Sequence, residues 1–231
     1  MKEFLVHSTF FGAVISLAAY EAGLFLKKKF KLAVLNPLLI GTVCVMAFLA
    51  LFRVEYKDYN ESAKYVSYLL TPATVCLAVP LYQQLELLKK NRKAVAGGIT
   101  AGVLASLSGV FLLAKLFSLS HEQYVTLLPK SITTAIGMDV SKELGGVETI
   151  TVAVIILTGI LGNVIAELIF RLFGIEEPVA KGLALGTASH AIGTSRALEI
   201  GPVEGAMSGL SIAVAGILTA LLCPLAVNLL P

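Results

Sequence analysis

Long apolar stretches separated by short polar ones dominate the chain. Six stretches have about the 20 residues that an α-helix needs to cross a bilayer, namely 4–26, 34–52, 64–85, 94–117, 149–172 and 204–230. Two more, 127–144 and 180–198, are interrupted by Gly, hydroxyl and charged residues, so each is either a full crossing or a re-entrant piece. The pattern predicts an all-α polytopic membrane protein, 1–231 forming a single domain, with about seven or eight transmembrane segments, several of them broken.

The composition agrees with this prediction. Of 231 residues, 57% are hydrophobic and 14% charged, whereas about a quarter of a soluble domain is charged. The three cysteines fall in apolar segments without CxxC spacing, so we expect neither a disulfide nor a metal site. No stretch suggests nucleic-acid binding, and no HExxH, GxSxG or GxxxxGK[ST] motif is present. We therefore expect no cofactor and no enzymatic activity.

Lysine and arginine in short loops predict the orientation. Lys27, Lys28, Lys29 and Lys31 follow the first apolar stretch, and residues 86–93 are again basic. The positive-inside rule places both loops in the cytoplasm and the amino terminus outside the inner membrane. The stretch from Phe4 to Leu26 is longer than the apolar core of a signal peptide, so we expect it to remain attached.

The first interrupted segment is Leu69–Gln84, with the sequence LLTPATVCLAVPLYQQ. Pro72 and Pro80 each remove a backbone donor, and in a membrane such breaks persist where protein or water satisfies the freed carbonyls. We include Pro72, Thr74 and Pro80 among the candidate substrate-binding residues. The alternative is a merely kinked helix.

The second interrupted segment is Leu128–Gly146, LPKSITTAIGMDVSKELGG. Pro129 is suited to begin a helix, whose first amides and hydroxyls would then face an anion. The candidate binding residues here are Lys130, Ser131, Thr133 and Thr134. The alternative is a helix that simply enters from the aqueous side, with Asp139 and Lys142 among the headgroups at its far end.

The third interrupted segment, residues 186–201, reads GTASHAIGTSRALEIG. Helical spacing places Thr187, His190 and Thr194 on one face, and an ionisable residue inside a membrane usually faces a pathway or a partner. Alternatively, the histidine bonds a neighbouring helix for structural reasons. The binding candidates here are Thr187, Ser189, His190, Thr194 and Arg196.

Several residues are candidates for ion or proton coupling. Asn163 and Glu167 lie four apart on one helix face, and Arg196 and Glu199 are spaced to form an ion pair. Glu167 is either a buried coupling carboxylate or an interfacial residue that reaches the headgroups. The candidates for coupling are Asp139, Asn163, Glu167, His190 and Glu199.

Broken hydrophobic segments in one chain typically indicate a transporter site near the membrane midplane. LLTPATV at 69–75 and LLPKSITT at 127–134 also share a short order of residues. This likeness is compatible with an internal repeat but does not define its symmetry.

The three interrupted segments together resemble the LrgB/CidB family over nearly the whole chain. The sequences that carry the resemblance are LLTPATVCLAVPLY, LPKSITTAIGMDVSKELGG and GTASHAIGTSRALEIGPVEGAMSGL. Family members usually have a proline where this chain has Ala135, so the break there is expected to be softer.

The resemblance implies one of two functions. Family members are described as holin/antiholin-like regulators of murein hydrolase export and lysis that act with a small LrgA/CidA-like membrane partner. Others look like carboxylate carriers, among them the plastid glycolate/glycerate translocator and bacterial pairs associated with pyruvate. Because polar residues at the midplane suit a carboxylate, transport of a small monocarboxylate such as pyruvate, glycolate or glycerate is the leading hypothesis and the regulator is the alternative. Small-residue faces leave a homo-oligomer open.

Overall fold

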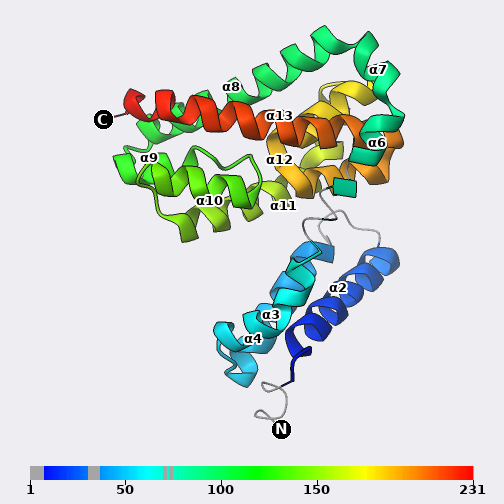
Figure 1. Ribbon diagram of the computed structural model, residues 1–231, viewed down its shortest axis with the longest axis vertical. Helices are drawn as coiled ribbons and strands as arrows, with labels where there is room; N and C mark the ends of the chain where they lie inside the picture. The colour runs from blue at the N-terminus through cyan, green and yellow to red at the C-terminus, as the bar shows by residue number, and fades with distance from the viewer. Residues whose placement is uncertain (1–7, 31–36, 70–71, 73–74, 77, 231) are drawn as a thin grey trace. The chain divides into compact units, whose positions relative to one another are not determined.

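The computed structural model describes residues 8–30, 37–69, 72, 75–76 and 78–230, and all regular elements in these ranges are helical. The chain divides into two compact units, Met1–Cys76 and Leu77–Pro231 (Figure 1). The expectation of a single domain over 1–231 therefore stays a prediction.

The first unit contains α2 (Phe11–Phe30), α3 (Pro37–Phe52) and α4 (Tyr56–Ser67). The backbone N–H of Gly12 donates to Ser62 Oγ at 2.7 Å, and Ser16 Oγ lies 2.7 Å from the Tyr59 hydroxyl. These two bonds hold α2 against α4. Two expected loops are instead helical: α2 continues through the lysines at 27–29, and most of the connection between the apolar stretches 34–52 and 64–85 lies in α4.

The second unit consists of helices of 6 to 25 residues. They are α6 (Ala78–Gln83), α7 (Leu85–Lys90), α8 (Arg92–Leu116), α9 (His121–Leu127), α10 (Thr134–Glu143), α11 (Glu148–Leu172), α12 (Pro178–Ile200) and α13 (Pro202–Ala226), followed by the 3-10 turn η1 (Val227–Leu229). Three helices in the described residues, α8, α11 and α13 with η1, are long and apolar enough to cross a membrane. α3 is a shorter apolar helix. This confirms a helical membrane protein, while the number of crossings remains a prediction.

The expected span at 64–85 is not one continuous helix in the part that the structure describes. α4 ends at Ser67, and α6 begins only at Ala78. The polar composition of α4 and Pro72 fit the interruption, because proline removes a backbone donor and clashes with the preceding turn, whereas Pro80 lies within α6.

The core of the second unit is built on one face of α8. Val95, Ile99 and Val103 recur every four residues and are buried, as helical periodicity requires. They belong to a cluster that includes Tyr124 of α9 and Met207 of α13. The buried Tyr124 hydroxyl donates to the carbonyl of Ala226 at 2.8 Å, so α9 is fixed to the end of α13.

A buried group of hydroxyls joins α9, α10 and α11. Thr151 Oγ1 lies 2.9 Å from the Thr126 carbonyl and 2.7 Å from Ser141 Oγ. Near this group α9 and α10 lie side by side and run in opposite directions, since Thr126 is level with Ser141 and an added Cβ at Gly137 would lie 3.4 Å from the Pro129 carbonyl. α10 begins at Thr134, so the expectation of a helix start at Pro129 is wrong. Residues 128–133 form the connection instead.

α12 is broken in its middle. Ser189 (φ −133°, ψ 16°) and His190 (φ 41°, ψ −138°) leave helical geometry, which separates a first limb, 178–188, from a second limb, 191–200. A Cβ at Gly193 would lie 2.5 Å from the Leu185 carbonyl, a contact that a straight helix does not make across eight residues. The two limbs of α12 therefore form a hairpin.

Candidate functional site

A cavity of about 640 Å³ lies between α8, the connection between α9 and α10, and the first limb of α12. Its walls are mainly small and apolar. Polar groups come from each of the three elements: Asn91 and Ser106 from the α8 side, Lys130 and Ser131 from the connection, and Glu177 and Thr187 from the α12 side. We call this cavity the α8–α12 pocket.

Lys130 supplies the positive charge of the α8–α12 pocket. Its ammonium donates to Ser131 Oγ at 2.9 Å, and Ser131 Oγ lies 3.0 Å from Ser106 Oγ. Within the described residues, Lys130 forms no ion pair. An ammonium with two further N–H groups beside two hydroxyls can bind a small anion such as a carboxylate.

Glycines of α8 make room for α12 along the wall of the pocket. A Cβ at Gly102 would lie 2.8 Å from Thr187 Oγ1, and one at Gly98 would lie 3.0 Å from Leu183. Thr187 donates to the carbonyl of Leu183 at 2.7 Å. The size of the pocket therefore depends on the absence of side chains on this face of α8.

The side chains at the break of α12 face α11 and are not part of the pocket wall. His190 is buried, and its Nε2 lies 2.9 Å from the Ile155 carbonyl. Gly159 provides the space for the imidazole ring, and Gly162 provides the space for Ser189. The structure thus gives His190 a bond to a neighbouring helix, the alternative considered for it.

The expected common face of Thr187, His190 and Thr194 is absent because the break lies between them. Thr187 faces α8, while His190 faces α11. Thr194 donates to the His190 carbonyl at 3.1 Å and lies 2.7 Å from Ser208 of α13. One polar residue thus faces each of the three helices around α12.

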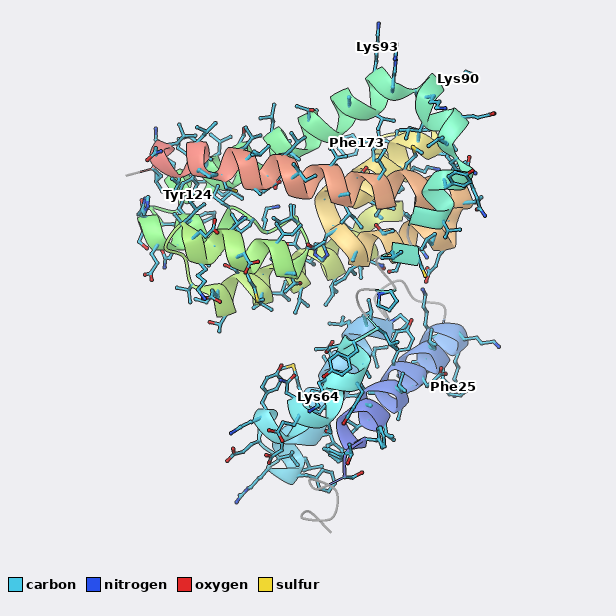
Figure 2. The ribbon with its side chains drawn as sticks, viewed as in Figure 1. Phe25, Lys64, Lys90, Lys93, Tyr124 and Phe173 are labelled. Atoms are coloured by element: carbon cyan, nitrogen blue, oxygen red, sulfur yellow. The ribbon has the colours of Figure 1, made fainter. Side chains whose placement is uncertain are left out.

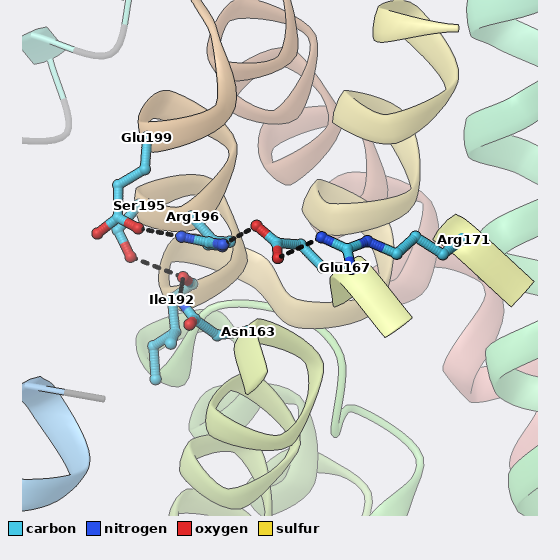
Figure 3. Close-up of polar contacts among 7 residues, drawn as sticks. All are labelled: Asn163, Glu167, Arg171, Ile192, Ser195, Arg196 and Glu199. Carbon is cyan, nitrogen blue, oxygen red and sulfur yellow. Dashed lines mark hydrogen bonds and ion pairs between the residues drawn. The ribbon is translucent and has the colours of Figure 1, made fainter. Parts of the chain in front are cut away.

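The second limb of α12 is tied to α11 by polar contacts (Figure 3). Asn163 Nδ2 donates to the Ile192 carbonyl at 3.0 Å. Arg196 forms ion pairs with Glu167 of α11 and, at 2.5 Å, with Glu199 of its own helix. The expected Arg196–Glu199 pair is confirmed, and Glu167 is half exposed and not an isolated buried carboxylate.

The remaining candidates lie outside the α8–α12 pocket. Thr133 is the N-cap residue of α10 but makes no side-chain capping bond, Thr134 begins α10, and Asp139 is exposed. Pro72 is exposed in the first unit, and Pro80 lies in α6. Thr74 lies outside the described residues. In the parts that the structure describes, no His, Cys, Asp and Glu side chains gather into a metal-binding group.

Ser106 is a pocket residue that sequence reasoning missed. It lies in a long apolar helix and bonds Ser131 from the opposite wall. The only sign of it in the sequence is a hydroxyl in the middle of an apolar helix. Ser108, two residues later, shows the same feature, so the sequence does not distinguish the two serines.

Comparison with known proteins places the chain among bacterial membrane proteins. The LrgB-like family model matches residues 16–229. The chain is 38% identical to the antiholin-like protein LrgB of Bacillus subtilis (strain 168), covering 96% of this chain and 97% of that protein. It is 35% identical to the holin-like protein CidB of Staphylococcus epidermidis (strain RP62A), covering 94% of each. No solved structure matches. The family match spans both units of the structure, and the chain belongs to the LrgB family.

Proposed function

We propose that the chain acts as a holin/antiholin-like membrane protein that regulates murein hydrolase activity and lysis. The observation that supports this is similarity over nearly the whole chain, at 35–38% identity, to relatives named antiholin-like and holin-like proteins. A small LrgA/CidA-like membrane protein is the proposed partner, and the bacterial inner membrane, with the amino terminus outside, is the proposed location.

The test is complementation in a bacterium that lacks its own LrgB-type gene. The chain is expressed alone and with an LrgA-like protein from the same host, and secreted murein hydrolase activity is measured on cell-wall gels. The proposal predicts a change in hydrolase activity and in autolysis that needs the partner. Equal activity with and without the chain, at confirmed membrane levels, would contradict it.

A second candidate function is the carriage of a small monocarboxylate such as pyruvate, glycolate or glycerate. The observation that favours it is the α8–α12 pocket, where the Lys130 ammonium, two serine hydroxyls and small residues leave a cavity of about 640 Å³. A carboxylate would take the free N–H groups of Lys130, while the apolar walls would face its carbon atoms. His190, Asp139, Asn163, Glu167 and Glu199 remain proposals for coupling ions or protons.

Direct binding tests this second candidate. Purified protein is titrated with pyruvate, glycolate or glycerate while its thermal unfolding is followed, because a ligand that binds the folded state raises the midpoint. The expected result is a saturable rise that an uncharged analogue, pyruvamide, does not give. An identical response to pyruvate and pyruvamide would contradict a carboxylate site.

A further inference from the structure

Two stretches of the second unit repeat one sequence pattern 56 residues apart. Residues 133–148 read TTAIGMDVSKELGGVE, and residues 189–204 read SHAIGTSRALEIGPVE, with seven of 16 positions identical. The same spacing relates Lys115-Leu116-Phe117 to Arg171-Leu172-Phe173.

The backbone repeats with the same spacing. α8 and α11 both have 25 residues, and their first residues, Arg92 and Glu148, are 56 apart. Each helix ends in a residue of positive φ, 51° at Ser118 and 62° at Gly174. Each end is closed by an equivalent bond, from Leu119 N to the Ala114 carbonyl at 2.9 Å and from Ile175 N to the Phe170 carbonyl at 2.8 Å.

The hairpins that follow these helices are also equivalent. Residues 121–143, which hold α9 and α10, and residues 178–200, which form α12, each have two limbs. In both hairpins a glycine of the second limb faces a carbonyl that precedes the turn. A Cβ at Gly137 would lie 3.4 Å from the carbonyl of Pro129, in the connection after α9, and one at Gly193 would lie 2.5 Å from the carbonyl of Leu185. These pairs too are 56 residues apart. Each of the two repeats within the second unit therefore consists of a long helix followed by a helical hairpin.

The two hairpins begin at opposite ends of the second unit. α8 and the first limb of α12 run in the same direction, because Gly98 faces Leu183 and Gly102 faces Thr187. α12 therefore begins and ends near the start of α8, which we call the basic end because residues 89–93 are rich in Lys and Arg. Lys90 and Lys93 project from this end in Figure 2.

The α9–α10 hairpin begins at the other end, which we call the C-terminal end. His121 Nδ1 lies 2.6 Å from the Leu230 carbonyl, so the start of α9 adjoins the end of the chain. The N–H of Val147 donates to Thr126 Oγ1 at 2.9 Å, so the start of α11 lies there as well. Figure 1 shows α9 and α10 at this end and α12 at the other.

We infer that residues 92–200 are two copies of one unit, a membrane-crossing helix followed by a re-entrant hairpin, inserted in opposite directions. Ser131 and Thr187, which are 56 residues apart, are then equivalent residues of the two hairpins, and both line the α8–α12 pocket. Inverted repeats of this kind place a solute site where their broken helices meet. The segments 127–144 and 180–198 are thereby assigned as re-entrant, and α13 as the closing crossing helix.

The assignment has a functional consequence that rests on the carboxylate-carrier candidate. Two equivalent hairpins that enter the membrane from opposite faces can open one pocket to each side in turn. Ser131 belongs to the α9–α10 hairpin, which enters from outside, and Thr187 belongs to α12, which enters from the cytoplasm. The basic end is cytoplasmic by the positive-inside rule. The inverted arrangement itself does not depend on what the protein carries or regulates.

Labelling of single cysteines tests the arrangement. In a full-length background with Cys44, Cys76 and Cys223 replaced by alanine, the exposed residues Glu122, Glu143, Glu176 and Pro202 are changed to cysteine one at a time. A membrane-impermeant maleimide is applied to right-side-out and inverted vesicles. Should Pro202→Cys fail to accumulate, Leu198→Cys at the same end replaces it.

The inference predicts that Glu122→Cys and Glu143→Cys react from the outside, and that Glu176→Cys and Pro202→Cys react from the cytoplasmic side. If the two cysteines of either pair react from opposite sides of the membrane, the hairpin between them crosses the membrane and the inference is overturned. Reaction of all four cysteines from the same side of the membrane would overturn it as well. If the labelling is as predicted but the purified protein binds no carboxylate in the thermal-unfolding titration, the carrier candidate is rejected and the inverted arrangement stands.

Discussion

At the scale of single residues, the charge and hydroxyls of the α8–α12 pocket are the chemistry to be tested. Lys130, Ser131 and Ser106 form one chain of hydrogen bonds. Because the described residues form no ion pair with Lys130, its ammonium can pair with an entering anion, although the same pocket wall also holds the carboxylate of Glu177.

Removal of that cation should weaken carboxylate binding. We expect Lys130→Met to lower the affinity for pyruvate or glycolate at least tenfold, and Ser131→Ala to lower it less, since hydrogen bonds to charged groups are worth about 1.5–3 kcal/mol. Titration calorimetry measures both. Thr134→Ala, outside the pocket, is the control, and an equal loss in that variant would point to a general folding defect.

His190 tests whether the break of α12 matters for activity. We expect His190→Ala to abolish substrate-driven uptake while the protein stays in the membrane, because the imidazole bonds α11 at the Ile155 carbonyl and holds the break in place. Uptake is compared at equal protein levels in membrane fractions. Ser195→Ala is the control, since Ser195 is exposed and bonds only its own helix. Unchanged uptake in His190→Ala would remove this residue from the mechanism.

At the scale of elements, glycines in the two hairpins permit close contacts, between the two limbs of α12 at Gly193 and between α10 and α11 at Gly137. The close approach at Gly193 leaves no room for a Cβ against the Leu185 carbonyl, and the approach at Gly137 leaves none against Ile155. Gly97 and Gly109 of α8 face open space. Substitutions at Gly97 and Gly109 can therefore serve as controls for substitutions at the hairpin glycines.

Alanine at the hairpin glycines should destabilise the fold. We expect Gly193→Ala to cost about 1–3 kcal/mol through overpacking against the backbone, and Gly137→Ala to cost less, because its added Cβ meets the end of the Ile155 side chain. Gly97→Ala and Gly109→Ala should be neutral or gain up to about 1 kcal/mol from helix propensity. Thermal unfolding in detergent measures the four variants. A Gly193→Ala variant as stable as the α8 controls would contradict the close contact between the two limbs of α12.

The hydroxyl group that joins α9, α10 and α11 gives a second prediction at this scale. Thr151→Val keeps the shape of the side chain but leaves the partners in α9 and α10 unsatisfied. We expect a loss of about 1–3 kcal/mol. The exposed neighbour Thr149 provides the control, because Thr149→Val should change the unfolding midpoint little.

At the scale of the whole molecule, the uninterrupted helices could be predicted from sequence. The stretches 94–117, 149–172 and 204–230 correspond to Arg92–Leu116, Glu148–Leu172 and Pro202–Leu229, because long apolar runs admit few other structures in a membrane. The stretch 64–85 was less predictable, since hydropathy alone does not distinguish a crossing helix from short helices separated by prolines.

The candidate site was predictable in part. The sequence identified Lys130, Ser131 and Thr187 by residue type, and these three do line one pocket. It did not show that α12 folds back at His190, because the positive φ there depends on contacts with α11. The assumption of a straight helix therefore placed Thr187 and Thr194 on a common face, although they contact different helices.

This LrgB-family chain either moves a small carboxylate through its α8–α12 pocket or acts only as a lysis regulator. The most direct measurement uses proteoliposomes that contain the purified chain, with and without an LrgA-like partner. Uptake of labelled pyruvate or glycolate under an imposed pH gradient is followed beside leakage of an entrapped dye. The pocket predicts saturable uptake that Lys130→Met removes, without dye leakage. Leakage of any small solute that Lys130→Met leaves unchanged would contradict a carrier and leave the holin-like role.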